Sequence, residues 1–283
     1  MKEDYGKLYI CPTPIGNLED ITLRVLRILK EVDLIAAEDT RHTIKLLNHY
    51  DIQKPLTSYH EHNREGKGKV LLEKLIAGEN IALVSDAGMP GISDPGADLV
   101  KLCVENEVTV EVLPGAAAFV TALVASGLST DKFTFEGFLD RDKKKKKKRL
   151  EAIKGEDRTL IFYEAPHRIR ATLQDLKQVL GNRHAVVARE LTKKHEEILR
   201  GELETLEVHF EQKEPKGEMV LMVAGANPED RKQKAYAWEN LSIQEHLTQY
   251  LETGMDKKEA IKTVAKERGI PKREVYECSI HLE

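Results

Sequence analysis

The fold of this chain is indicated most clearly by the segment Val84-Ser85-Asp86-Ala87-Gly88-Met89-Pro90-Gly91-Ile92-Ser93-Asp94-Pro95-Gly96. Residues 81–84 before it are apolar strand formers, and the apolar residues in 97–103 after it have helical spacing. The segment is therefore predicted to be a compact turn that joins a strand to a helix. Asp94 is the expected N-cap and Pro95 the expected first helical residue, so that a bare helix N-terminus faces a crevice.

A turn of this kind is where open α/β sheets bind ligands, because it lies at the carboxyl end of a strand. Three glycines in the segment allow a ligand to approach the backbone, and two prolines stiffen it. The alternative is a tight strand-to-helix loop that binds nothing.

The composition is that of an ordinary soluble protein. Its 283 residues predict two domains, or one large domain with an appendage, and the net charge is −4. No apolar run reaches the roughly 20 residues that span a bilayer, and Met1–Gly6 lacks an apolar signal core. We therefore expect a cytoplasmic protein without a membrane partner. Net acidity argues against indiscriminate coating of nucleic acid but allows one basic patch.

Cysteine and histidine spacing predicts neither disulfides nor a metal site. Cys11, Cys103 and Cys278 are odd in number and lack CxxC spacing. His60 and His62 lie two residues apart, and no third ligand has a fixed spacing to them. Neither GxxxxGK[ST] nor GxGxxG occurs, which argues against P-loop phosphoryl transfer and the usual dinucleotide fold.

Strands and helices alternate in the first half of the chain, which predicts a parallel sheet covered on both faces. The predicted strands are 8–11, 33–37, 56–59, 81–84 and 108–112. The predicted helices are 21–31, a short one through 44–47, one from Asn63 to Gly78, one from Asp94, and a small-residue helix at 116–126.

A second α/β lobe is predicted to begin near Ser129. Its strands are expected at 159–163, 185–189, 197–200 and 219–224, and its helices at 168–180 and 203–210. A polar connector at 227–232 leads to two or three short helices after Leu241, with breaks at 254–256 and 269–271. The predicted domains are thus 1–128, 129–226 and 227–283.

Two charged clusters follow predicted strands. In Glu38-Asp39-Thr40-Arg41 the guanidinium suits a phosphate while Glu38 or Asp39 orients a hydroxyl, or else the cluster is an N-cap beside a structural ion pair. Tyr163–Arg168 would project His167 and Arg168 into a cleft between the lobes, or else hold a capping carboxylate and a solvated arginine. The polar loop 189–197 is either functional or a plain charged hairpin.

Arg141–Arg149 contains eight cations and one acid. It is either a solvated segment beside a helix or a site for the phosphate backbone of RNA or DNA, which would relieve the repulsion between the lysines. The predicted RNA-binding residues are Arg41, Lys143, Lys144, Lys145, Lys146, Lys147, Lys148, Arg149, His167 and Arg168.

An ordered series of motifs between about Leu8 and Gly225 resembles the ribosomal RNA small subunit methyltransferase I family, of the tetrapyrrole methylase superfamily. The motifs are Thr13–Leu18, Ala37–Arg41, Tyr59–Asn63, Val84–Gly96, Pro114-Gly115, Phe135–Phe138, Tyr163–Arg168, Arg189–Lys193 and Lys216–Glu218. The resemblance implies a two-lobe α/β fold of the tetrapyrrole-methylase type (class III methyltransferase). This fold has a parallel sheet in the N-terminal lobe, a mixed sheet in the C-terminal lobe and here a small helical tail.

The resemblance also implies an activity and partners. The protein would be a homodimer that binds S-adenosylmethionine between its lobes and methylates the 2′-hydroxyl of a cytidine ribose in the decoding region of small-subunit (16S) ribosomal RNA. The implied donor-binding residues are Pro14, Gly16, Asp86, Ala87, Gly88, Pro90, Ile92, Ala117, Ala118, Glu164, Gly217 and Glu218.

The chain departs from the family's pattern at three positions. Met89 replaces the usual threonine, Ala117 a frequent serine and Asp140 a frequent proline. None of these changes removes a backbone donor, so donor binding is still expected.

A sulfonium methyl is already activated, so catalysis is largely the positioning of the hydroxyl, worth about 7–11 kcal/mol. A base that takes the hydroxyl proton adds roughly 10²–10⁴-fold. The candidate catalytic residues are Glu38, Asp39 and Lys193.

Two other functions fit the sequence. One is the same fold and methyl donor with a tetrapyrrole carbon or a modified histidine of a translation factor as acceptor. The other is a non-catalytic RNA-binding assembly factor that uses Lys143–Arg149 and the helical tail.

Overall fold

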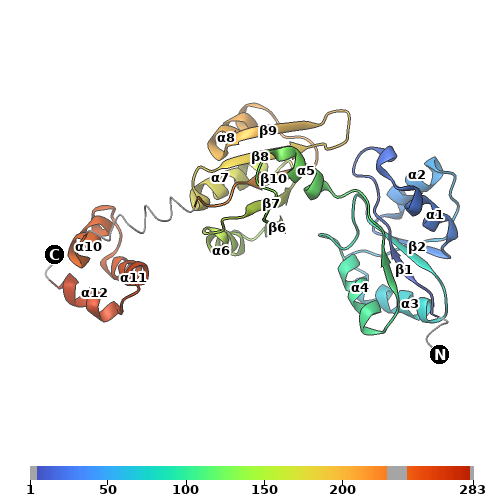
Figure 1. Ribbon diagram of the computed structural model, residues 1–283, viewed down its shortest axis with the longest axis horizontal. Coiled ribbons are helices and arrows are strands. Elements are labelled where there is room, and N and C mark those ends of the chain that lie inside the picture. Colours follow the sequence, from blue (N-terminus) through green and yellow to red (C-terminus); the bar gives the residue numbers. More distant parts are fainter. Residues whose placement is uncertain (1–4, 228–240, 281–283) are drawn as a thin grey trace. The chain divides into compact units, whose positions relative to one another are not determined.

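The computed structural model describes residues 5–227 and 241–280, and the chain divides into two compact units, Met1–Gly225 and Ala226–Glu283. The first unit contains two five-stranded sheets, and the second contains short helices (Figure 1). The predicted polar connector at 227–232 lies outside the described residues from 228 onward, as do residues 1–4 at the start of the chain.

The first sheet is parallel throughout, with the strand order β3-β2-β4-β1-β5. Its strands are β1 (Leu8–Ile10), β2 (Leu34–Ala37), β3 (Leu56–Ser58), β4 (Ile81–Val84) and β5 (Val110–Val112). The five predicted strands and their parallel direction are confirmed. The central strand β4 is buried along its whole length, because helices cover both faces of the sheet.

Two hydrophobic clusters hold these helices to the two faces of the sheet (Figure 1). The helices are α1 (Leu23–Glu31), α2 (Thr40–His49), α3 (Arg64–Ile76) and α4 (Gly96–Glu105), with the 3₁₀ turn η1 (Leu18–Asp20) before α1. Val25, Leu29 and Leu47 bring α1 and α2 onto one face, while Leu71 and Leu99 bring α3 and α4 onto the other. A parallel sheet covered on both faces is therefore confirmed.

Several helix starts differ from the prediction. The helix expected from Ile21 begins at Leu23, because Thr22 Oγ1 accepts a hydrogen bond from the backbone N–H of Val25 at 3.1 Å. Asn63 does occupy the cap position of α3, but its Oδ1 accepts from the N–H of His60 at 2.9 Å and makes no cap bond.

The second sheet is mixed, as predicted, with the order β6-β7-β10-β8-β9. Its strands are β6 (Phe133–Phe138), β7 (Thr159–Glu164), β8 (His184–Arg189), β9 (Glu197–Glu202) and β10 (Met219–Val223). Only β6 and β7 pair in parallel, and the other pairs are antiparallel. The sequence did not predict β6, whose register shifts between Phe135 and Gly137.

Helices cover both faces of this sheet as well. α6 (Lys143–Ile153), α7 (Ile169–Leu180) and α8 (Leu203–Gln212) share one hydrophobic cluster with the sheet. α5 (Ala118–Ser126) packs on the opposite face, where Ala122 and Leu123 contact a cluster that includes Ile161 and Val186. The small-residue helix predicted as part of the first lobe therefore packs on the second sheet. Its composition favours close packing on a sheet without specifying which sheet.

Three short helices form the described part of the second unit, within the two or three that were predicted. They are α10 (Ile243–Glu252), α11 (Lys257–Arg268) and α12 (Lys272–Ser279), packed around Leu247, Val264 and Val275. Across residues 5–227 and 241–280, no helix has the length and apolar character needed to cross a membrane.

Candidate functional site

The turn after β4 is held in place by the segment that follows β1. Thr13 and Gly88 exchange backbone hydrogen bonds of 2.9 and 3.0 Å, and Ser85 Oγ donates to the carbonyl of Gly88 at 3.1 Å. Gly88 has a φ of +83°, and a Cβ there would lie 3.2 Å from Ile15 Cγ2. The backbone N–H of Gly88 is therefore already bonded within the protein.

Asp94 closes the end of the same turn. Its Oδ1 accepts from the backbone N–H groups of Gly91 at 2.8 Å and Gly96 at 2.7 Å. Pro95 takes the cap position and α4 begins at Gly96. The helix N-terminus is therefore capped by a carboxylate, and the prediction of a bare N-terminus facing the crevice is wrong.

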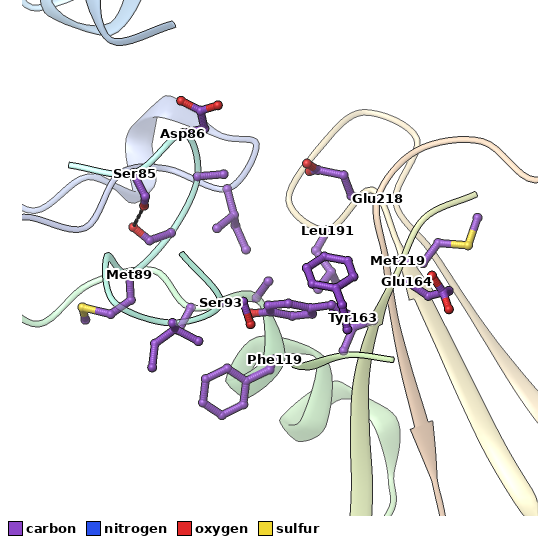
Figure 2. Close-up of a pocket in the computed structure, with 18 of the residues that line it drawn as sticks. Ser85, Asp86, Met89, Ser93, Phe119, Tyr163, Glu164, Leu191, Glu218 and Met219 are labelled. Atoms are coloured by element: carbon purple, nitrogen blue, oxygen red, sulfur yellow. Dashed lines mark hydrogen bonds between the residues drawn. The ribbon is translucent and has the colours of Figure 1, made fainter. Parts of the chain in front are cut away.

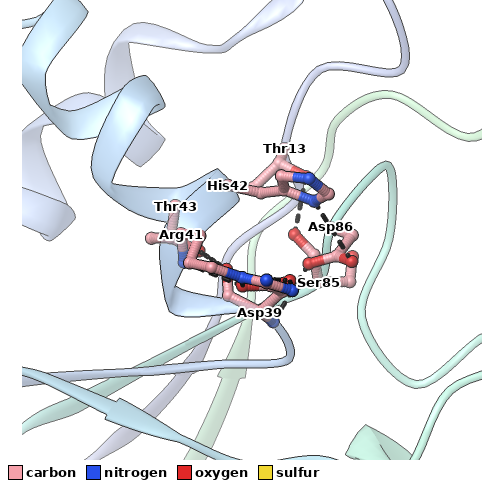
Figure 3. A network of polar contacts seen from close by, with 7 residues as sticks. All are labelled: Thr13, Asp39, Arg41, His42, Thr43, Ser85 and Asp86. Carbon is pink, nitrogen blue, oxygen red and sulfur yellow. Dashed lines mark hydrogen bonds and ion pairs between the residues drawn. The ribbon is translucent and has the colours of Figure 1, made fainter.

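The cluster Glu38–Arg41 follows β2, and the helix α2 begins within it, at Thr40. Asp39 is the N-cap of this helix and accepts from Arg41 through the backbone N–H at 2.8 Å and through Nε at 3.0 Å. The Arg41 guanidinium holds the pKa of the Asp39 carboxyl well below its usual range. Of the two functions considered for this cluster, Asp39 and Arg41 show the structural one, an N-cap beside an ion pair (Figure 3).

Glu38 has a different environment from Asp39, one residue away. Burial raises the pKa of the Glu38 carboxyl, and the neighbouring carboxylates of Asp86 and Asp94 raise it further. Asp86 Oδ1 in turn accepts the backbone N–H of Asp39 at 3.0 Å. The ends of β2 and β4 are thus tied together, with Glu38 in the wall of a cavity.

A cavity of about 440 Å³ lies between the turn after β4 and the second sheet. Figure 2 shows Ser85 and Asp86 on the side of the turn after β4, and Tyr163 and Leu191 on the side of the second sheet. Further lining residues come from the start of α5, the end of β7, the loop after β8 and the start of β10. The volume is in the range of pockets that bind small organic ligands and cofactors. We call this space the donor cavity.

Most of the residues predicted to bind the methyl donor line this cavity. Those that do are Asp86, Ala87, Gly88, Ile92, Ala117, Ala118, Glu164 and Glu218, together with the catalytic candidates Glu38 and Lys193. Pro14 lines a second, smaller cavity, and Asp39 lines neither. Pro90 is buried within the turn.

Two predicted glycines act at a distance from the donor cavity. A Cβ on Gly16 would lie 2.5 Å from Lys193 Cγ, so Gly16 allows the first segment to pack against the loop after β8. Gly217 has a φ of +79°, and a Cβ there would lie 2.3 Å from Glu190 Oε1. Neither glycine lines the cavity, but both allow close packing around Lys193 and Glu190, which do.

The lining of the donor cavity is mainly apolar and acidic. Its acidic residues are Glu38, Asp86, Asp94, Glu164, Glu190 and Glu218. Lys193 is the one basic residue among the lining residues, and its Nζ lies 2.9 Å from Glu190 and 3.5 Å from Glu218. Excess negative charge beside apolar surface suits a cationic ligand with a flat apolar portion, and a sulfonium donor that carries an adenine fits this description.

The prediction missed the aromatic part of the lining. Phe119, Phe138 and Tyr163 contribute to the cavity, and the Phe138 and Tyr163 rings lie 5.5 Å apart. Phe135 lies behind them, 4.7 Å from Phe119 and 5.0 Å from Tyr163. The recurrence of Phe at 133, 135 and 138 is the sequence signal that would have indicated a strand here.

One expectation for the lysine run was a solvated segment beside a helix. In the structure the run is itself part of the helix α6. Lys146 is only 8% exposed, and its Nζ lies 3.0 Å from Thr172 Oγ1 and 2.7 Å from Asp175 Oδ2. Lys146, Leu150 and Ile153 form the inward face of α6. Lys146 is therefore not an exposed RNA-binding cation, which corrects the prediction for this residue.

The other predicted RNA-binding residues differ in availability. Arg149 is paired with Glu136 through two hydrogen bonds of 2.6 and 2.7 Å. Arg168 is largely buried, with Nε 3.3 Å from Glu164 and Nη2 donating to the carbonyl of Leu139 at 2.6 Å. It is a structural partner of Glu164, and its predicted position in an open cleft is wrong. The exposed ones are Arg41, Lys143, Lys144, Lys145, Lys147, Lys148, Arg149 and His167.

Within the described residues, no group of three or more His, Cys, Asp or Glu side chains is arranged to hold a metal ion. The rings of His60 and His62 lie 6.0 Å apart, and His60 Nε2 lies 3.4 Å from Asn63 Nδ2.

Comparisons with known proteins agree with this architecture. The sequence profile of the family described as Tetrapyrrole (Corrin/Porphyrin) Methylases matches residues 7–207. Diphthine synthase superposes with a TM-score of 0.60 and 16% identity, over 78% of this chain and 90% of that chain. At this identity the likeness concerns the fold alone.

Relatives of higher identity carry one shared name. Ribosomal RNA small subunit methyltransferase I of Halalkalibacterium halodurans is 54% identical over 276 residues, which cover 97% of this chain and 95% of that protein. The protein of the same name from Thermotoga maritima is 48% identical over 220 residues, which cover 78% of this chain and 99% of that protein. The chain belongs to the ribosomal RNA small subunit methyltransferase I family, within the tetrapyrrole methylases.

Proposed function

We propose that this protein transfers a methyl group from S-adenosylmethionine to the 2′-hydroxyl of a cytidine ribose in small-subunit (16S) ribosomal RNA. The observation that carries the proposal is the 54% identity to a ribosomal RNA small subunit methyltransferase over nearly the full length of both chains. The acidic and aromatic donor cavity supports it. A tetrapyrrole or protein acceptor is less well supported. The relatives of high identity are named as ribosomal RNA methyltransferases, whereas the tetrapyrrole enzymes match in fold alone.

The donor would lie between the turn after β4 and the second sheet. Bound there, it supplies a methyl group already activated by the positive sulfur, so the protein's task is to hold the acceptor oxygen in line. Asp86 and Glu218 are the predicted polar contacts, while Ile92, Ala117 and Ala118 offer apolar surface. Glu164 acts mainly as a support, because its two oxygens already accept from Ala165 N–H and Thr172 Oγ1.

Among the three predicted catalytic residues, we keep Glu38 as the group that touches the donor. Its carboxylate lies in the cavity wall and balances the charge of the sulfonium. Asp39 is bound to Arg41, which makes it a poor proton acceptor. The ion pairs of Lys193 with Glu190 and Glu218 raise its pKa against the effect of burial, so that it stays protonated near neutral pH.

The RNA would contact the exposed cations of α6, together with Arg41 and His167. Lys143, Lys144, Lys147 and Lys148 are exposed, and their charges release counterions when they meet phosphates. Lys146 and Arg168 drop out of the proposed RNA surface because both are buried ion-pair partners.

We further propose a homodimer formed through α5. Val120 and Val124 lie one helical turn apart and are 45% and 73% exposed. Large exposed aliphatic side chains on one helix face are typical of a subunit interface. Val124→Asp is expected to shift the protein from dimer to monomer in light scattering, whereas Val208→Asp on α8, where Val208 is 45% exposed, leaves the dimer intact. A wild-type protein that is monomeric at micromolar concentration contradicts this proposal.

The function is tested by methyl transfer from isotope-labelled S-adenosylmethionine to purified small ribosomal subunits, followed by mapping of ribose methylation. We expect label at one cytidine ribose. Label in protein or in a tetrapyrrole would favour another acceptor, and the absence of donor binding in calorimetry with S-adenosylhomocysteine would favour a non-catalytic assembly factor.

A further inference from the structure

A second cavity, of about 230 Å³, shares Ser85 and Asp86 with the donor cavity. Its other lining residues include Thr13, Pro14, Leu18, His42, Lys45 and Leu46. It therefore combines apolar surface with the exposed side chains of His42 and Lys45 from α2. Asp86 therefore contributes to the walls of both cavities.

His42 and Asp86 form an acid–histidine pair at this point (Figure 3). The Nδ1 atom of His42 lies 3.4 Å from Asp86 Oδ2, and the other carboxylate oxygen accepts the backbone N–H of Asp39 at 3.0 Å. The backbone bond fixes the carboxylate, and the carboxylate favours the tautomer with the proton on Nδ1. The lone pair of Nε2 is then available to accept a proton, and the side chain is 58% exposed.

The remaining charged groups near His42 are unsuited to this task. Arg41 and Lys45 on the same helix are cations, and Asp39 is bound to Arg41. Glu38 faces the donor cavity and, in the proposed function, the sulfonium. His42 thus supplies the imidazole of the second cavity, and it lies beside Asp86, which lines both cavities.

We propose that the acceptor nucleotide enters the second cavity and that His42 accepts the proton of its reacting hydroxyl, with Asp86 orienting the imidazole. This rests on the proposed function and names a catalytic residue for it. As the ribose oxygen bonds to the methyl carbon, the carbon–sulfur electron pair stays on the sulfur. The hydroxyl proton moves to His42 Nε2, and the imidazolium that results is stabilised by Asp86.

The test compares His42→Gln with His49→Gln, a substitution in the last turn of the same helix. His49 is exposed and lies outside both cavities, with its ring 4.8 Å from that of Tyr50. In single-turnover methylation of small ribosomal subunits, H42Q is expected to slow transfer by about 100- to 10,000-fold while H49Q stays at the wild-type rate. For both variants, the affinity for the donor measured by calorimetry and the affinity for small ribosomal subunits should stay within about twofold of the wild-type values.

Chemical rescue separates a proton acceptor from a structural histidine. His42→Ala should regain part of its rate when free imidazole is added, because the base is resupplied in the space left by the side chain. If H42A is slow and imidazole has no effect, or if H42Q transfers methyl at the wild-type rate, His42 is not the base and the inference is overturned.

A second variant tests the cavity without touching the proposed base. Leu46→Trp, at a half-buried position of α2 that lines the second cavity, is expected to fill this cavity, raise the KM for small subunits at least tenfold and leave the Kd for S-adenosylhomocysteine unchanged. An unchanged KM places the acceptor elsewhere. If the wild-type protein itself methylates no small-subunit RNA, the proposed function fails. If the wild-type protein methylates small-subunit RNA and the His42 and Leu46 variants do so equally well, the proposed function stands and this inference alone fails.

Discussion

At the scale of single residues, Gly88 shows how backbone geometry shapes the site. Its positive φ and its paired hydrogen bonds with Thr13 bring the turn after β4 against the first segment of the chain. An L-residue is strained at this φ, and here its Cβ would also press on Ile15.

Gly88→Ala is expected to lower the free energy of unfolding by about 1–3 kcal/mol. Gly127→Ala is the matched control, because Gly127 has a φ of +80° and a Cβ there would meet nothing within 4 Å. Urea titration should show a larger loss for G88A than for G127A, and calorimetry should show weaker donor binding for G88A alone. Equal losses and equal donor affinity would mean that the contact with Ile15 is unimportant.

Glu38 provides a prediction about charge. Glu38→Gln should weaken S-adenosylmethionine binding by roughly tenfold, because it removes the negative charge beside the sulfonium, and should leave the neutral S-adenosylhomocysteine nearly unaffected. Calorimetry with both ligands measures this ratio.

The same residue sets an expected pH dependence. Since burial raises the pKa of Glu38, its protonation begins at a higher pH than for an exposed glutamate. As the pH falls through that raised pKa, the wild-type preference for the sulfonium over the sulfide should decline toward that of E38Q. A ratio that is independent of pH in the wild type would remove Glu38 from the donor contact.

At the scale of elements, α6 is a helix of lysines with one face in the core. The helical period turns Lys146 inward with Leu150 and Ile153, while Lys147 stays exposed. The aliphatic stem of Lys146 packs in the interior, and its ammonium is compensated by Thr172 and Asp175.

Lys146→Ala is therefore expected to lower the free energy of unfolding by about 1–3 kcal/mol, against about 0.5 kcal/mol or less for Lys147→Ala. For RNA binding, the larger effect is expected from Lys147→Ala rather than from Lys146→Ala. K147A is expected to reduce the slope of log affinity against log salt by about 0.7–0.9, and K146A to leave it unchanged. A reduced salt slope for K146A would show that this lysine leaves the core to meet phosphate.

At the scale of the whole molecule, the division into Met1–Gly225 and Ala226–Glu283 bears on which part carries the activity. Both cavities belong to the first unit. The relative from Thermotoga maritima is matched over 99% of its length by 220 residues of this chain, so about a fifth of this chain has no counterpart there.

A fragment that ends at Gly225 is expected to fold and to bind S-adenosylhomocysteine with the Kd of the full chain, within about twofold. Circular dichroism and calorimetry measure the two properties. Methyl transfer by the fragment then shows whether the helical tail is needed for the RNA. A fragment that fails to fold would show that the first unit depends on the tail.

Much of the fold was predictable because its signals are local. Four of the five strands of the second sheet and all five of the first are short apolar runs bounded by turn residues, and α1 and α7 show helical spacing of apolar side chains. The segment 84–96 does line a cavity, since a turn at the carboxyl end of a buried strand is placed by chain direction alone, and donor binding there stays a prediction. The lobe boundary near Ser129 and the roles of the site residues stay predictions.

The amino-acid sequence by itself determined the order of strands and helices in the first sheet, the parallel sense of that sheet and the family, because each depends on neighbours along the chain. Only the tertiary structure decided which sheet α5 covers, that Lys146 and Arg168 point inward, and that His42 meets Asp86. These contacts join residues that are distant in sequence or lie on faces set by packing. Residue type and spacing specify that a side chain is charged or apolar, whereas the packed chain specifies what that side chain meets.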